Sequence, residues 1–472
     1  MSDLGERANC FDRSALCFSC RRQWGAFRSR GRTIGYDKKP PRAIGLAGAI
    51  VINLNSVVGS GIFALPAVLF AAAGTFSPIA ILIYACMYGT VMAVIAKLST
   101  VFRQSGGAQL YAQHAFGPFA GFQAGWLALA TNMIGASANF HVLVSYLGAI
   151  FPFFADPAIR LITIAALVAF FTGISISGTT RSIGAIKVGT FLKLAPLVLL
   201  VVLGFAQNGI PSEISVPVFS EFESIALLLA YAFSGADVAI AAAGETKNPR
   251  KTLMRAIFLN LGGIAFLYAL IMWAYIAIAP DSTNLDTPLA AAGEAVLGQT
   301  GVLMISLAAI FSIATFQLNV FVAIPRIAYG MARRGLMPHI LAYVSPRFET
   351  PLAAIAGYGL IVGSLALAGD FSRLVELMVS VEQILFSLSI GALIVMWWRN
   401  DAGLRGSMDA RWLLIIPAAI AMVTWLFSQV PLNTIIPTLG FVVAGFALYF
   451  ISKRGAVAHD GIELPEEREE QA

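Results

Sequence analysis

Two glycine-containing segments interrupt long apolar stretches of the sequence. The first runs from Val57 to Pro66 and reads VVGSGIFALP, and the second runs from Tyr231 to Asp237 and reads YAFSGAD. Glycine inside an apolar helix weakens it and can leave backbone N–H and C=O groups pointing sideways. At membrane depth such groups are tolerated only beside a cavity or a ligand. Both segments are therefore candidate binding sites built from backbone.

Close helix packing is the alternative explanation for such segments. Small residues in a membrane helix commonly allow a neighbouring helix to approach, and a lone Gly-x-Gly would favour that explanation. Two matched interruptions, five apolar stretches apart, instead favour two broken helices with a substrate site between them. This is the pattern of a protein built from two inverted repeats.

Each broken helix offers two kinds of backbone chemistry. The start of a half-helix carries free N–H groups and the positive end of the helix dipole, which favour a carboxylate. The end of a half-helix carries free carbonyl groups, which favour an ammonium group or another cation. A site with both ends suits a zwitterion, and α-amino acids are the commonest candidates. The predicted substrate-binding residues are Val58, Gly59, Ser60, Gly61, Ile62, Tyr231, Phe233, Ser234, Gly235 and Ala236.

Two aromatic residues flank the second interruption. Tyr231 and Phe233 could pack against lipid or other helices, which is the usual environment of a membrane aromatic. Their position beside the break favours a gate that closes over bound substrate, and we predict Phe233 for that role.

Three ionisable residues lie inside apolar stretches, where a charge is costly. Lys193 is several residues past Lys187, which places it too deep to reach the membrane interface easily. Asp237 could take up a proton, bind a cationic substrate or cap the helical segment that follows it. Glu382 could make a structural hydrogen bond to a neighbouring helix, which is the simpler explanation. If it lines the pocket instead, it would favour a cationic side chain.

Polar residues of other apolar stretches complete the candidates. We predict Asn132 and Asn319, together with Glu382, for the pocket around the substrate's side chain. Asn139 and His141 are ambiguous, since a single histidine of this kind is more often a core residue than a proton relay. The sequence predicts no catalytic residue, no metal site and no cofactor.

The elements that must hold these residues are membrane-spanning helices. Of the 472 residues, 58% are hydrophobic and 12% charged, about half the charged fraction of a soluble protein. Helical stretches long enough to cross a bilayer core of ~30 Å lie at roughly 44–71, 76–99, 119–150, 158–178, 188–206, 222–244, 255–279, 300–331, 352–369, 374–398, 411–428 and 432–451. Their continuous apolar character excludes a β-barrel. The fold class is thus an all-α polytopic membrane protein with about 12 spans.

The boundaries follow from the spans and the interruptions. We predict a disordered basic cytoplasmic tail at 1–41, a first repeat at 42–206, a second repeat at 207–400, two further helices at 401–452 and a cytoplasmic tail at 453–472. No signal peptide is recognisable at the start of the sequence. No polar segment is long enough for a large soluble catalytic domain, so an enzyme is not expected.

Charges in the loops give the spans an orientation. Lys and Arg concentrate in alternate loops, including those near 247–255, 333–347 and 399–411, whereas the opposite loops are acidic or neutral apart from Arg160 and Arg373. The positive-inside rule then places both termini in the cytoplasm. The same rule, together with anionic lipid, explains the net charge of +6 without a nucleic-acid partner.

Four motifs resemble those of the amino acid–polyamine–organocation (APC) superfamily of permeases. They are Gly59-Ser60-Gly61-Ile62-Phe63 with Pro66; Ser105-Gly106-Gly107, Tyr111, Phe116-Gly117-Pro118, Gly121-Phe122 and Gly125-Trp126; Phe233-Ser234-Gly235 followed by Glu245-Thr246-Lys247-Asn248-Pro249-Arg250; and Arg326, Tyr329, Met331-Ala332-Arg333 with Gly335-Leu336-Met337-Pro338. They extend over most of the chain between Ile44 and Pro338. Gln109, Gly244-Glu245 and Asp237 depart from the usual pattern and leave the subfamily and the substrate open.

The resemblance implies a leucine-transporter-like fold of five plus five inverted spans, with two additional helices. It also implies a role for Lys193, because a fifth-span lysine in similar proton-coupled relatives stands where sodium binds in sodium-driven members. Lys193 would then replace sodium and, with Asp237, take part in proton coupling. Burial disfavours the charged form of a lysine, which makes proton release feasible.

The leading hypothesis is a secondary active amino acid transporter, proton-coupled or exchanging, that alternates access around the two broken helices. A cationic amino acid or polyamine exchanger is the alternative, motivated by Asp237 and Glu382. A sensor that binds amino acids without moving them is a third hypothesis. The expected partners are an amino acid, protons and the lipid bilayer of a plasma membrane, such as the bacterial inner membrane. A homodimer could form through the last two spans.

Overall fold

The computed structural model of the protein describes residues 45–102, 107–178, 183–211, 223, 225–236, 249–279, 286–333 and 335–453. Within these ranges the chain forms α-helices and short 3-10 turns, without a β-strand. The predicted tail at 1–41, nearly all of the tail at 453–472, Asp237 and the motif residues 245–248 lie outside the described residues.

The helices of the apolar stretches follow the predicted order. They are α2 (Leu46–Val57), α3 (Gly61–Ala73), α4 (Ser77–Val101), α6 (Pro118–Ile150), α7 (Pro157–Ser177), α8 (Ile183–Asn208), α10 (Ala226–Phe233), α12 (Pro249–Ile278), α14 (Gln299–Arg333), α15 (Leu352–Ala368), α16 (Phe371–Arg399), α18 (Trp412–Ser428) and α19 (Leu432–Lys453). In the described part of the chain, seven helical stretches are long and apolar enough to cross a bilayer, and five shorter apolar helices accompany them. The protein is therefore a multi-pass α-helical membrane protein, as the composition predicted.

Polar residues mark several of the helix ends. Asp156 is the N-cap residue of α7 and accepts hydrogen bonds from the backbone N–H groups of Ala158 and Ile159, at 2.9 and 3.2 Å. Asp370 is the N-cap residue of α16 and accepts from the backbone N–H of Arg373 at 2.9 Å. Each carboxylate satisfies donors that have no partner within the helix. These two aspartates thus mark the N-terminal ends of α7 and α16, the helices that follow two of the acidic loops.

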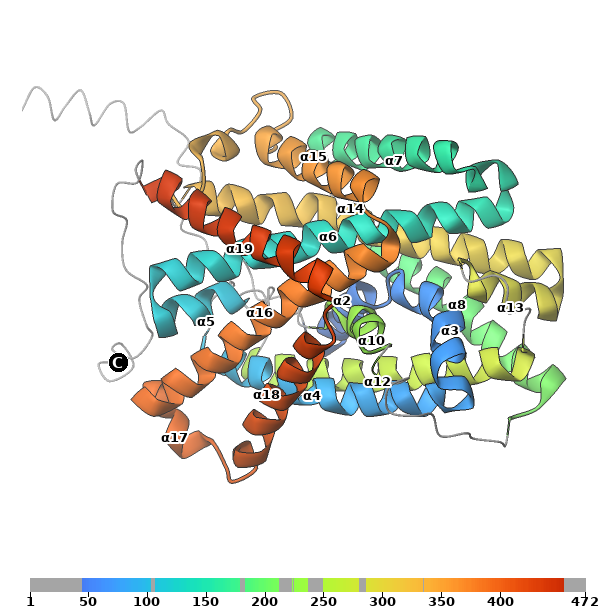
Figure 1. Ribbon diagram of the computed structural model, residues 1–472, viewed down its shortest axis with the longest axis horizontal. Coiled ribbons are helices and arrows are strands. Elements are labelled where there is room, and N and C mark those ends of the chain that lie inside the picture. Colours follow the sequence, from blue (N-terminus) through green and yellow to red (C-terminus); the bar gives the residue numbers. More distant parts are fainter. Residues whose placement is uncertain are drawn as a thin grey trace, which may run out of the picture. The chain divides into compact units, whose positions relative to one another are not determined.

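The helices that carry the two interruptions lie between two groups of neighbours. In Figure 1, α4 and α12 run side by side along one flank, while α6, α14, α15 and α7 lie on the other. The short helix α10 is seen nearly end-on near the middle of the picture, where it contacts α3, α4 and α16. Both interruptions are therefore surrounded by long helices.

The last two long helices attach to different parts of the bundle. Helix α18 packs mainly against α4, whereas α19 packs against α6 and α16 (Figure 1). The side chain of Gln123 donates to the carbonyl oxygen of Val442 at 2.9 Å, and the indole of Trp126 donates to that of Phe441 at 2.7 Å. These bonds join α6 to α19.

A lysine fastens the end of α4 to the connection before α18. This connection contains α17 (Leu404–Ser407). Lys97 Nζ donates to the carbonyl oxygen and to the hydroxyl of Ser407, at 2.8 and 3.0 Å, and lies 5.7 Å from the centre of the Trp412 ring. The cation is thus held by both hydrogen bonds and an aromatic face.

Two helices of ten residues were not predicted from the sequence. Helix α5 (Gly107–Phe116) packs against α6 and α16, and α13 (Pro288–Leu297) packs against α14 and α3. Both are too short to span a bilayer, so a search for spanning stretches treats them as loops. They lie within the connections between long helices.

Candidate functional site

The first interruption separates α2 from α3. Helix α2 ends at Val57 and α3 begins at Gly61, so that three residues between them leave the helical path. The N–H of Gly59 donates to the carbonyl oxygen of Val57 at 2.8 Å, and the N–H of Phe63 donates to that of Ser60 at 3.1 Å. The break thus lies where the glycines predicted it.

Side chains from three other helices hold the carbonyl groups at the end of α2. Lys193 of α8 is fully buried, and its Nζ donates to Asn55 Oδ1 at 2.7 Å, to the carbonyl oxygen of Val58 at 2.8 Å and to that of Asn55 at 3.2 Å. Ser312 of α14 donates to Val58 O at 3.1 Å, and Tyr268 of α12 donates to Val57 O at 3.2 Å. A cation therefore lies at the negative end of the α2 dipole.

The start of α3 has a different arrangement. Ser60 occupies the N-cap position, but its side chain makes no capping hydrogen bond. Instead, Ser60 Oγ lies 2.6 Å from the hydroxyl of Tyr231, which also donates to Asn139 Oδ1 at 3.1 Å. The first N–H groups of a helix have no partner within the helix. Because Ser60 does not cap them, an incoming carboxylate can do so.

Two glycines allow the interruptions to approach each other. A Cβ atom on Gly61 would lie 2.9 Å from the Cα of Ala232 in α10. Gly235 has a φ of +91°, and a Cβ atom there would lie 3.1 Å from the carbonyl oxygen of Ser56. Side chains at these positions would force the two segments apart. The two breaks are thus in direct backbone contact.

The second interruption begins where α10 ends. Phe233 is the last residue of α10, and the N–H of Ser234 donates to the carbonyl oxygen of Tyr231 at 3.2 Å. Ser234 Oγ donates to Glu382 Oε1 of α16 at 2.7 Å, and Glu382 is 5% exposed. The structural hydrogen bond considered for Glu382 is therefore present, and its partner belongs to the predicted site.

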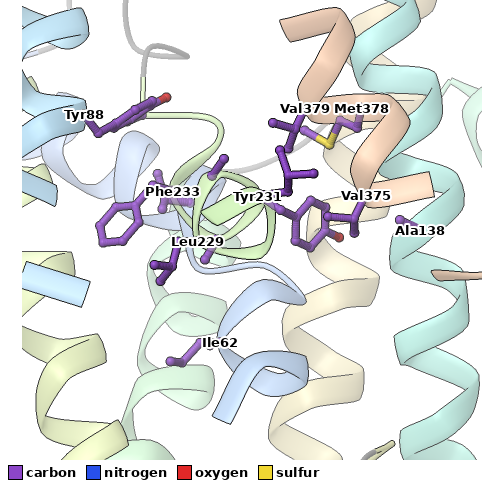
Figure 2. Packing of buried hydrophobic residues seen from close by; sticks show 14 of the residues in the cluster. Ile62, Tyr88, Ala138, Leu229, Tyr231, Phe233, Val375, Met378 and Val379 are labelled. Carbon is purple, nitrogen blue, oxygen red and sulfur yellow. The ribbon is translucent and has the colours of Figure 1, made fainter. Parts of the chain in front are cut away.

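The two aromatic residues of α10 point in different directions. Figure 2 shows the Tyr231 ring beside Val375 of α16, with its hydroxyl toward the side of Ala138, and the Phe233 ring on the side of Tyr88. The Phe233 ring centre lies 5.6 Å from that of Tyr84, 6.3 Å from that of Tyr88 and 5.7 Å from that of Tyr268. Phe233 is fully buried among these rings. Its role as a gate stays a prediction.

Two of the predicted pocket residues do not join this network. The amide of Asn132 donates to the carbonyl oxygen of Ala128 in its own helix at 2.9 Å. Asn319 is half-buried on α14. Among the described residues, no hydrogen bond connects either side chain to the interruptions, and their contribution to the pocket stays a prediction.

Several residues of the network were not singled out from the sequence. Asn55, Tyr268 and Ser312 all bond to the end of α2 or to its lysine, and Tyr84 lies against Phe233. Asn55 carries a usable signal, because it is a polar residue two positions before the break in an apolar stretch. The others resemble ordinary residues of a membrane helix.

Several known transporters are similar to this chain over most of its length. A transporter of Mycobacterium tuberculosis described as uncharacterized is 26% identical over 87% of this chain and 91% of its own length. The serine/threonine exchanger SteT of Bacillus subtilis is 25% identical over 76% of this chain and 84% of its own length. The Asc-type amino acid transporter 1 of Mus musculus is 27% identical over 82% of this chain and 76% of its own length.

The family model described as amino acid permease matches residues 44–459. That range contains both interruptions and every described contact around them. Because the match covers most of the chain, the protein belongs to the amino acid permease family, as its motifs predicted, and is a secondary amino acid transporter.

Proposed function

We propose that this transporter binds the zwitterionic part of an α-amino acid between its two broken helices. The substrate's carboxylate would take the free N–H groups at the start of α3, and its ammonium group would take carbonyl groups at the end of α10. The observation that carries this proposal is the side chain of Ser60. It bonds to Tyr231 at 2.6 Å rather than capping α3.

We further propose that transport is coupled to protons, with Lys193 as the coupling residue. Lys193 is fully buried and holds three oxygen atoms at the end of α2. A buried lysine can release a proton, and the neutral amine, which keeps two N–H donors, would bond the three oxygens less strongly and leave one of them free. Asp237, also predicted for proton coupling, lies outside the described residues.

The orientation and the membrane are part of the same proposal. Arg333 and Arg399 end α14 and α16, and Arg347 and Arg405 lie in the connections that follow these helices; we propose that these alternate connections are cytoplasmic, together with both termini. The five-plus-five repeat, the bacterial inner membrane as location and a homodimer through α18 and α19 stay predictions as well.

The transport proposal is tested with purified protein in proteoliposomes. A ligand-stabilisation screen of the twenty amino acids identifies the substrate, with serine and threonine first because SteT is a serine/threonine exchanger. We then expect counterflow, in which unlabelled substrate inside the vesicles drives accumulation of labelled substrate. Saturable binding without counterflow would instead support a sensor.

Uptake into the same vesicles distinguishes a transporter of neutral amino acids from a transporter of cationic ones. Labelled arginine and leucine are compared at two pH values, in the parent protein and with Asp237→Asn and Glu382→Gln combined. A cationic exchanger requires that neutralising both carboxylates reduces arginine uptake. If the change has no effect on arginine uptake, the cationic alternative is excluded.

Replacing Tyr231 by phenylalanine should weaken substrate binding. The variant loses the hydroxyl that holds Ser60 and Asn139, and Ser60 can then cap α3 in competition with the substrate's carboxylate. A hydrogen bond of ~1 kcal/mol corresponds to a rise in KM of about fivefold. The KM of each protein is measured from the kinetics of uptake.

Tyr358→Phe is the matched control for that variant. Tyr358 is also buried, and its hydroxyl donates to the carbonyl oxygen of Asn132 at 3.3 Å, which belongs to neither interruption. We expect its KM to equal that of the parent. Equal effects of the two substitutions would contradict a specific role for Tyr231.

A further inference from the structure

Helix α6 carries three polar residues at alternate positions near its middle. Ser137 Oγ donates to the carbonyl oxygen of Val362 in α15 at 3.0 Å. His141 Nε2 donates to that of Ala366, also in α15, at 2.9 Å. Asn139 is two residues from each of them, which is about 200° around a helix of 3.6 residues per turn. Its side chain therefore lies on the side of α6 opposite to α15.

The side of α6 that carries Asn139 runs along the first interruption. Tyr146, two turns further along α6 and on the same side, donates to the carbonyl oxygen of Phe63 in α3 at 2.7 Å. A Cβ atom on Gly59, within the break, would lie 4.0 Å from Asn139 Oδ1. Asn139 is 5% exposed. Its amide is thus buried beside the break.

The hydrogen bonds around Asn139 have a defined direction. The hydroxyl of Tyr231 donates to Asn139 Oδ1 at 3.1 Å, and a phenol has one hydrogen to give. Ser60 must therefore be the donor in its bond of 2.6 Å to Tyr231. The hydrogens of both hydroxyls are thereby used. Asn139 Nδ2 carries two more, and within the described part of the chain it donates to no protein group.

The groups that this arrangement offers to a ligand are hydrogen-bond donors. The first N–H groups of α3 have no partner within the helix and lie at the positive end of its dipole. The two N–H groups of Asn139 come from the facing side of α6. A carboxylate has two oxygens with about four acceptor positions, so it can accept from both sets, whereas an ammonium group accepts from neither.

We propose that Asn139 is a substrate-binding residue, whose Nδ2 donates to the α-carboxylate while its Oδ1 holds the hydroxyl of Tyr231. The amide thus links the two broken helices to the ligand, because Tyr231 belongs to α10 and the carboxylate would lie at the start of α3. Asn139 would thereby select substrates that carry a carboxylate. The inference rests on the proposed zwitterion site.

Two substitutions of Asn139 separate contact with the substrate from support of Tyr231. Asn139→Asp keeps the shape of the side chain and an oxygen that accepts from Tyr231, but replaces the N–H donors by a charged oxygen. Asn139→Ala removes both functions. Dissociation constants are measured by calorimetry on purified protein, with L-serine as the first probe and otherwise the amino acid that the parent binds in the stabilisation screen.

We expect binding to weaken about tenfold in Asn139→Ala and about a hundredfold in Asn139→Asp. The alanine variant loses a hydrogen bond to a charged group, and the aspartate variant adds repulsion between two carboxylates. A residue that only supports Tyr231 predicts the opposite order, with aspartate close to the parent and alanine weakest. That order, or equal affinity in all three proteins, would overturn the proposal.

A double-mutant cycle gives the same answer if the aspartate variant does not fold. Asn139→Ala is combined with Tyr231→Phe, which already removes the bond between these two residues. We expect the alanine substitution to weaken binding about tenfold in this background as well. If Asn139 acts only through Tyr231, the alanine substitution has no further effect, and the proposal is wrong.

Ser137→Ala is the matched control on the same helix. It also replaces a buried polar residue by alanine, and it removes a bond to another helix. Because Ser137 faces α15, the dissociation constant should equal that of the parent. A loss of affinity equal to that of Asn139→Ala would show that any disturbance of α6 weakens binding, and would contradict a specific role for Asn139.

The same measurements distinguish this inference from the proposed function. If the parent protein binds no amino acid, the transport site itself is wrong. If the parent binds an amino acid and both Asn139 variants retain its affinity, the site stands and only the role of Asn139 is refuted.

Discussion

Replacing Lys193 by alanine will abolish the dependence of uptake on a proton gradient. The variant removes the only group at the end of α2, among the described residues, that can carry and release a positive charge there. Hydrogen bonds from a charged donor contribute about 1.5–3 kcal/mol each, so the end of α2 also loses much of its support. Uptake with and without an imposed pH difference measures the effect.

Lys193→Arg is the informative companion to the alanine variant. Arginine can still donate to the carbonyl groups at the end of α2, but it does not release its proton. We expect it to bind substrate and to lose proton-driven accumulation. Sodium should have no effect on the parent, and strong stimulation by sodium would refute the assignment of Lys193.

Replacing Gly61 by alanine will reduce uptake by about a hundredfold while the protein still reaches the membrane. The added Cβ atom would lie 2.9 Å from the Cα of Ala232, so the two interruptions must separate. Overpacking of this kind costs about 1–3 kcal/mol, and a displacement of about 1 Å in a site can cost a hundredfold in rate. Initial rates of uptake by the parent and by Gly61→Ala measure this loss.

Gly357→Ala serves as the control for that substitution. Gly357 lies inside α15, and no atom would come within 4 Å of a Cβ atom there. Alanine is the better helix former, so transport and stability should equal or exceed those of the parent. A loss of transport in both variants would show that membrane glycines in general, rather than the contact of the two breaks, limit activity.

The sequence predicted the places where the helices break but not what the breaks touch. The ends of α2 and α10 follow from local properties, since Gly59, Gly61 and Gly235 interrupt otherwise apolar stretches. The bond from Lys193 to Asn55 depends on the rotation and tilt of two helices separated by 138 residues. A hydropathy pattern contains neither quantity.

The pocket residues illustrate the same limit. Glu382 and Asn132 are both polar residues in apolar helices, and their sequence context predicts both for the pocket around the substrate's side chain. In the structure Glu382 bonds to the second interruption, whereas Asn132 bonds within its own helix. Which side of a helix faces the site is decided by packing against its neighbours, which one sequence does not reveal.

The attachment of the last helices bears on how the protein is made. Gln123 and Trp126 of α6 find their partners in α19, 319 and 315 residues later, and Lys97 finds Ser407 after 310 residues. A ribosome releases these early helices into the membrane long before their partners exist, and contacts of such sequence separation form late. These polar groups of α6 and α4 therefore cannot form the bonds seen in the structure until α19 and α17 have been made.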